Sequence, residues 1–76
     1  MDKHMLRRIV DEVFRAEQAS LLTDNLERYS GVAELSESYL RNLTPDREGN
    51  FSYLVMAVVR SQFRARDFIS AQTTIN

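Results

Sequence analysis

The side chains best suited to specific recognition lie close together between residues 37 and 42. Glu37, Ser38, Arg41 and Asn42 fall on one side of a helix when residues 32–43 are wound at the usual helical pitch. Arginine can pair with guanine and asparagine with adenine, each through two hydrogen bonds, while serine and glutamate can add auxiliary contacts. This polar face is therefore either a surface that reads DNA bases or an ordinary solvated helix face.

Residues that could support enzyme chemistry are few and scattered. His4 is the only histidine and lies near a chain end, and the adjacent carboxylates of Asp11 and Glu12 point in different directions from a helix. Gly31 and Gly49 are isolated, so no glycine-rich loop could cradle a phosphate. We therefore expect no catalytic residue, no metal site, no cofactor and no enzymatic activity.

Length and composition indicate a small globular domain. The chain has 76 residues, 43% of them hydrophobic and 28% charged, which predicts one domain over residues 1–76. It lacks cysteine, for which a cytoplasmic setting is the simplest interpretation. The longest apolar run, residues 53–59, is far shorter than the roughly 20 residues that span a bilayer, so no membrane association is expected. The net charge of −1 is unfavourable for a DNA-binding protein. Net charge does not show where the charges lie, so a local basic face is still compatible with the sequence.

The first half of the chain predicts a lead helix and an ambiguous segment. Apolar residues recur at three- and four-residue spacing near the start, which predicts a helix over about residues 2–20. The stripe fails at Glu17 and Ser20, so we expect this helix to end near residues 20–23. Residues 24–43 are predicted to be helical with one interruption.

Two places for that interruption are open. Ser30 and Gly31 resemble a helix end followed by a new cap, which predicts a second helix over about residues 32–43. The alternative break lies at Glu34 and Leu35 and would create a candidate helix-turn-helix within residues 24–43.

The second half of the chain predicts a long apolar helix over about residues 50–70. Pro45 ends the preceding helix near Leu43, and Asn50 can cap the new one. This helix is apolar almost all round at its centre, so it is either central to the fold or covered by a partner. The fold class is therefore all-α, a small bundle of three to four helices. A homodimer or another protein partner is expected at this set of residues: Leu54, Val55, Val58, Val59 and Phe63.

Residues 35–43 read Leu-Ser-Glu-Ser-Tyr-Leu-Arg-Asn-Leu, which resembles the first helix-turn-helix of AraC-type transcription regulators. In that family a Leu-Ser-x-Ser-x-Leu-x-x-Leu run forms the recognition helix. Residues 9–13 are similar to the lead helix of the family, and residues 22–26 to the entry of the motif. The resemblance covers one of the two motifs of the family and implies a small DNA-binding regulator.

Two functional hypotheses follow. In the first, duplex DNA is the partner, residues 36–43 enter the major groove, and four arginines contact phosphates: Arg7, Arg8, Arg47 and Arg64. In the second, the chain is a non-enzymatic helical interaction module, such as an adaptor, chaperone or inhibitor, and forms a homodimer or binds another protein through its long apolar helix.

Overall fold

A computed structural model describes residues 3–76, which form four α-helices and no strand. The helices are α1 (Lys3–Leu21), α2 (Leu26–Leu40), α3 (Asn50–Arg64) and α4 (Phe68–Ile75). The prediction of an all-α fold with three to four helices is confirmed, while a helix start at residue 2 lies outside the described residues. None of these helices has the length and apolar character needed to cross a bilayer.

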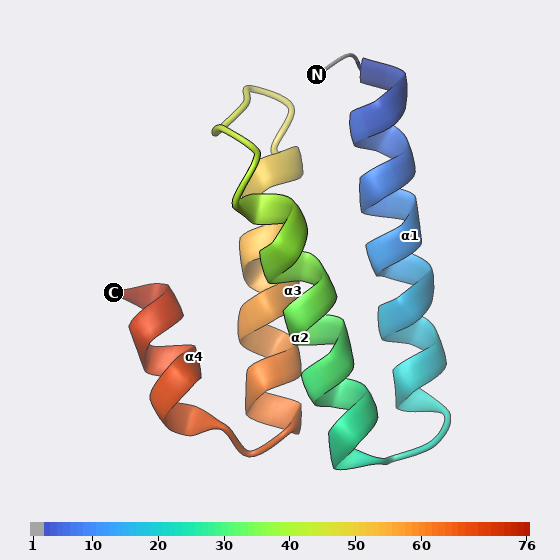
Figure 1. Cartoon of the computed structure of the whole chain (residues 1–76), viewed down its shortest axis with the longest axis vertical. Coiled ribbons are helices and arrows are strands. Elements are labelled where there is room, and N and C mark those ends of the chain that lie inside the picture. The colour runs from blue at the N-terminus through green and yellow to red at the C-terminus, as the bar shows by residue number, and fades with distance from the viewer. Residues whose placement is uncertain (1–2) are drawn as a thin grey trace.

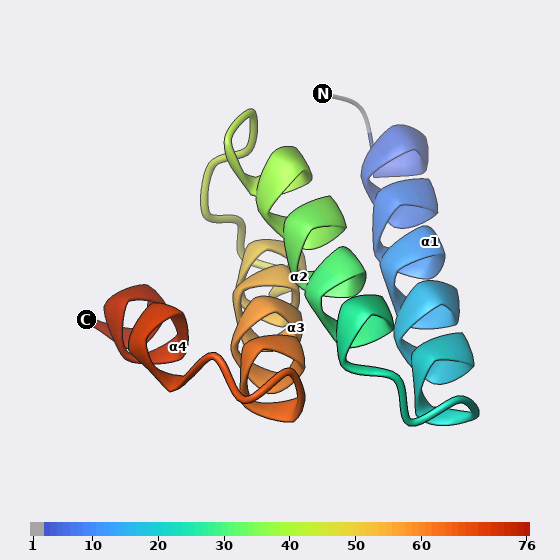
Figure 2. The same cartoon turned by 60° about the horizontal axis from the view of Figure 1, so that its bottom comes forward.

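The four helices form a slab of 33 × 27 × 16 Å. The first three pack as a bundle, in which α1 contacts both α2 and α3, and α4 lies against the side of α3 (Figures 1 and 2). Because α3 contacts all three other helices, it is the central element of the fold.

Most of the apolar circumference of α3 is covered by helices of its own chain, while Met56 and Phe63 stay exposed. Leu54 and Val58 are fully buried and Val59 is 5% exposed, and Leu54 packs in one cluster with Ile9 and Val13 of α1. The prediction that Leu54, Val58 and Val59 form a partner interface is therefore wrong. The reason is physical: a helix that is apolar all round needs several neighbours, and this chain supplies three.

The long helix predicted over residues 50–70 is two helices in the structure. The helix α3 ends at Arg64, Arg66 adopts a left-handed φ of 65°, and the amide of Asp67 donates to the carbonyl oxygen of Gln62 at 2.9 Å. This pattern is a Schellman-type helix end. The side chain of Asp67 then caps α4 by accepting a hydrogen bond from the amide of Ser70.

The helix α2 is continuous, so neither predicted break is present. It runs through Gly31 and through residues 34–35, and the hydroxyl of Ser36 donates to the carbonyl oxygen of Val32 instead of capping a new helix. Burial of Tyr29, Val32 and Ala33 on one side explains this continuity, because packing along the whole helix outweighs the unfavourable helix propensity of one glycine. The candidate helix-turn-helix in residues 24–43 is therefore not formed.

The two glycines are expected to respond oppositely to replacement by alanine. Gly31 lies inside α2 with open space where a Cβ would stand, so Gly31→Ala should raise the free energy of unfolding by about 0.5–1 kcal/mol. Gly49 precedes α3 with a φ of 82°, so Gly49→Ala should lower it by about 1 kcal/mol. Urea denaturation of the two variants measures both changes, and destabilisation by Gly31→Ala would contradict a continuous α2.

Candidate functional site

The residues predicted to read DNA bases do not form one free face in the structure. The carboxylate of Glu37 accepts a hydrogen bond from Gln62 of α3 at 2.9 Å, and the hydroxyl of Ser38 donates to the carbonyl oxygen of Leu35. Arg41 and Asn42 are exposed but lie in the turn that follows α2. The predicted recognition surface is therefore divided between α2, where Glu37 is bonded to α3, and the turn that follows it.

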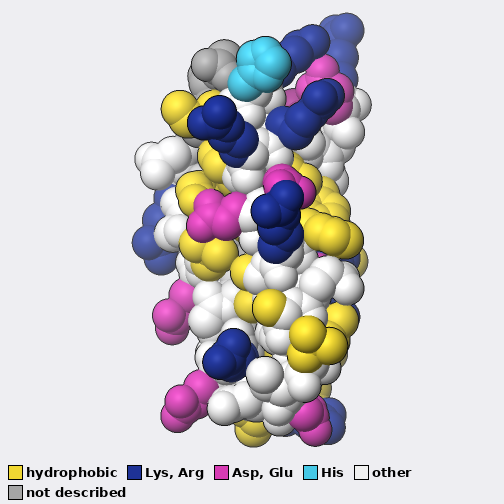
Figure 3. Space-filling view, turned by 90° about the vertical axis from the view of Figure 1, so that its right-hand side faces the viewer, with side chains coloured by type: hydrophobic (Ala, Val, Ile, Leu, Met, Phe, Trp, Pro, Cys, Tyr) yellow, Lys and Arg dark blue, Asp and Glu magenta, His cyan; other side chains and the backbone are white. Residues whose placement is uncertain are grey.

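Three of the four predicted phosphate contacts lie toward one end of the molecule. Arg7 and Arg8 are exposed on the first turns of α1, and Arg47 is exposed in the loop before α3. An ion pair of 3.6 Å between Lys3 and Glu48 links these two segments. A cluster of Lys and Arg side chains is visible at the upper end of Figure 3. Arg64, the fourth predicted phosphate contact, is the last residue of α3, and its guanidinium bonds Glu17 of the same chain.

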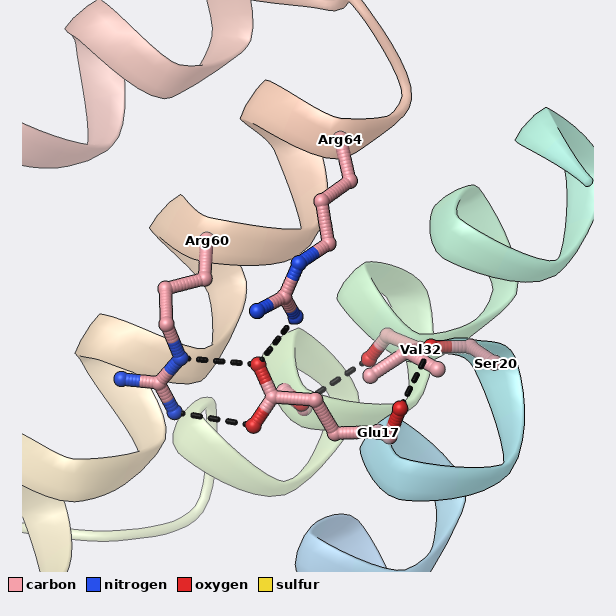
Figure 4. A network of polar contacts seen from close by, with 6 residues as sticks. Glu17, Ser20, Val32, Arg60 and Arg64 are labelled. Carbon is pink, nitrogen blue, oxygen red and sulfur yellow. Dashed lines mark hydrogen bonds and ion pairs between the residues drawn. The ribbon is translucent and has the colours of Figure 1, made fainter. Parts of the chain in front are cut away.

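A buried carboxylate bridges α1 and α3. Glu17 is 3% exposed and accepts two hydrogen bonds from Arg60, from Nε at 2.8 Å and from Nη2 at 2.9 Å. Nη1 of Arg64 donates to the same carboxylate at 2.7 Å (Figure 4). We call these three residues the ion triad. Arg64, which was predicted to contact phosphate, instead pairs a buried charge of its own chain through this contact.

The ion triad changes the ionisation of Glu17. Burial alone would raise the pKa of its carboxyl, but the hydrogen bonds and positive charges of Arg60 and Arg64 outweigh burial and lower the pKa below its ordinary value of 4.5. The carboxylate is therefore ionised in the folded chain near neutral pH, and the triad carries two positive charges against one negative charge.

The lowered pKa of Glu17 predicts acid-sensitive stability. A carboxyl whose pKa is lower in the folded state stabilises the fold above its unfolded value of 4.5, and this stabilisation is lost as the pH falls through the folded value. We expect the free energy of unfolding to decrease below that pH and the decrease to be smaller in Glu17→Gln. Urea denaturation over a series of acidic buffers measures this, and parallel pH profiles for both proteins would contradict it.

Large apolar side chains are exposed along both sides of the ion triad. On α1, Phe14 and Leu21 lie three residues before and four residues after Glu17, so they share its side of the helix, and they are 48% and 44% exposed. On α3, Met56 and Phe63 lie four residues before and three residues after Arg60, so they share its side of the helix, and they are 49% and 44% exposed. Since Glu17 and Arg60 are bonded, these apolar side chains flank one seam between α1 and α3.

The helix α4 extends this surface. The rings of Phe63 and Phe68 are 5.6 Å apart between centroids, and Ile75, seven residues after Phe68, lies on the same side of α4. A different side of α3, about 100° from Phe63, faces α2, where Gln62 bonds Glu37. We define the apolar face by six residues: Phe14, Leu21, Met56, Phe63, Phe68 and Ile75. Hydrophobic side chains also gather along the right-hand edge of Figure 3, which looks onto α1.

Other exposed apolar residues lie away from this face. Leu22 and Leu26 flank the connection between α1 and α2, and Met5 lines a hollow on the α2 side of α1. Ile69 is 83% exposed and, being next to Phe68, points about 100° away from it around α4. These positions provide matched controls for substitutions on the apolar face.

Of the predicted partner-contacting residues, only Phe63 belongs to the apolar face, and Val55 is half-buried. Sequence patterns missed Glu17, whose polarity was interpreted as the failure of an apolar stripe. Arg60 and Arg64, four residues apart on an apolar helix, are the signal that could have paired with it.

Among residues 3–76, no group of three or more His, Asp or Glu side chains is placed to hold a metal ion. Comparison with protein-family models, with curated protein sequences and with solved structures finds no match to this chain. The likeness of residues 35–43 to AraC-type regulators stays a prediction, and the contacts within the chain are the basis on which a function can be proposed.

Proposed function

We propose that this chain is a non-enzymatic helical module that binds another protein through its apolar face. The observation that carries the proposal is the exposure of six large apolar side chains, each between 44% and 62% exposed, along one side of three helices. Contiguous exposed apolar side chains on a small domain are typical of protein interaction sites. The DNA-binding hypothesis depends on a turn at residues 34–35, which the continuous α2 lacks.

The positive charge of the ion triad indicates that the partner at the apolar face is a different protein and not a second copy of the chain. A symmetric dimer through this face would bring the same patch of both copies together. The guanidinium groups of Arg60 and Arg64, 35% and 30% exposed, would then approach those of the other copy, and like charges at an interface are unfavourable. Three of the five residues of α3 from which the homodimer was predicted, Leu54, Val58 and Val59, are buried by the chain itself, so they give no reason for self-association.

The proposal is tested by the size of the complex that the chain forms in extracts of its own cells. We expect the wild-type chain to elute from size-exclusion chromatography at a mass well above its own 8.8 kDa. The double variant Met56→Glu, Phe63→Glu should elute as the monomer, because charged side chains on the face cannot be buried at an apolar interface.

A matched double variant controls for the added charge. Leu22→Glu, Ile69→Glu introduces the same charge at two highly exposed apolar positions outside the face, so it should still elute with the partner. Circular dichroism checks that both variants are folded. A wild-type chain that elutes as a monomer, or equal behaviour of the two double variants, would contradict the proposed function.

A further inference from the structure

One end of the apolar face contains a shallow hollow of about 310 Å³. It is lined by Asp24, Tyr29, Phe63, Arg64, Arg66 and Phe68. The two phenylalanine rings meet at 56° and provide an apolar wall, while the arginines form a polar rim. A space of this size and lining suits one apolar or aromatic side chain that has a charged group beside it.

The rim of this hollow carries more positive than negative charge. Two arginines and one aspartate line it, and the carboxylate of Asp24 already accepts a hydrogen bond from the hydroxyl of Tyr29 at 3.2 Å. Along the adjoining seam, Glu17 is shared by Arg60 and Arg64. The side chains around the hollow and seam therefore leave one positive charge in excess.

Arg66 stands at the rim in a position that favours glycine. Its φ of 65° is left-handed, which costs a non-glycine residue about 1 kcal/mol. Its side chain is exposed and, within residues 3–76, makes no hydrogen bond or ion pair. A strained position thus presents an unpaired guanidinium beside two aromatic rings.

The carboxylate of Asp67, the residue after Arg66, does not offset this charge. It caps α4 through the amide of Ser70, and it lines a separate hollow together with Glu37 and Gln62. That hollow lies between α2, α3 and α4 and includes neither Phe63 nor Phe68, so it is separate from the hollow that contains Arg66.

From these contacts, and resting on the proposed function, we infer that the partner docks through an acidic amphipathic helix. An apolar side chain of that helix occupies the hollow between Phe63 and Phe68, and a neighbouring carboxylate pairs with Arg66. The rest of its apolar stripe lies along the seam, against the apolar side chains of α1 and α3. Two rows of apolar side chains around a positively charged centre are complementary to such a helix.

The inference is tested with two synthetic amphipathic peptides. Both carry leucine and phenylalanine at the same positions and a hydrocarbon staple that holds them helical, but one has glutamate and the other lysine at every charged position. Fluorescence anisotropy with the full chain measures the dissociation constants. We expect the acidic peptide to bind about tenfold more tightly or better, with an advantage that shrinks as salt is added.

Variants of the rim sharpen the test. Arg66→Gln should weaken the acidic peptide by about three- to tenfold, whereas Arg28→Gln, on an exposed position of α2, should leave it unchanged. Arg66→Gly should weaken the acidic peptide equally while raising the melting temperature, because glycine adopts this φ without strain. Lower affinity together with higher stability separates a binding role from a structural one.

The opposite results overturn the inference. Equal affinity for both peptides, preference for the basic peptide, or no binding of either peptide would each show that the docking element is not an acidic amphipathic helix. The proposed function is judged separately, since it fails only when the chain forms no face-dependent complex in extracts.

Discussion

Replacing Leu54 by alanine is expected to lower the free energy of unfolding by about 3 kcal/mol. Leu54 is fully buried at the centre of α3, and its truncation removes buried apolar surface and leaves a cavity that the neighbouring helices can only partly close. For a domain of this size such a change is a large part of the total stability. Urea denaturation followed by circular dichroism at 222 nm, the usual helix band, measures the loss.

The matched substitution on the same helix is Phe63→Ala. The side chain of Phe63 is 44% exposed, so its removal should cost much less than the removal of Leu54. If Phe63→Ala proved more destabilising than Leu54→Ala, the buried and exposed sides of α3 would be the reverse of those in the structure, and the apolar face would lose its basis.

Glu17→Gln is expected to lower the free energy of unfolding by about 3 kcal/mol at neutral pH. The substitution leaves the guanidinium groups of Arg60 and Arg64 close together without their shared carboxylate, and removing one member of a buried ion pair typically costs 3–5 kcal/mol. The lower end of that range applies here because both arginine side chains reach solvent. Thermal and urea denaturation provide the measurement.

Asp11→Asn is the control for charge removal on the same helix. Asp11 pairs with Arg15 at 3.2 Å on the exposed surface of α1, where such a pair contributes about 0.5 kcal/mol or less. A loss from Glu17→Gln as small as that from Asp11→Asn would contradict the account of the ion triad. Replacing all three residues of the triad by apolar ones should restore stability, since no buried charge then remains unpaired.

Local periodicity located α1 and the start of α3 but did not predict which sides of the helices are covered. The apolar spacing of residues 6–14 and the punctuation at Pro45 predicted α1 and the start of α3 to within a few residues. Burial around α3 depends on how many other helices pack against it, and spacing along one helix contains no such information. For this reason Leu54 and Val58 were assigned to a partner although their own chain covers them.

Ser30 and Gly31 were given too much weight as the end of a helix in the interpretation of the sequence. The buried carboxylate of Glu17 in α1 was also not identified. Local capping preferences at Ser30 and Gly31 are each worth about 1 kcal/mol, less than the packing of Tyr29 and Val32 along a continuous helix. Glu17 was interpreted as the end of an apolar stripe because its partners lie more than forty residues away along the chain. Such a long-range pair is visible only once the helices are placed in space.

The most direct measurement of the central claim is site-specific photocrosslinking in the native cells. The photoreactive residue p-benzoylphenylalanine replaces, one at a time, each of the six residues of the apolar face and the four exposed apolar controls Met5, Leu22, Leu26 and Ile69. We predict that irradiation yields a discrete adduct with one protein from positions of the face and not from the controls. Adducts from the controls alone, equal adducts from both sets, or none from any position would contradict a binding role for the apolar face.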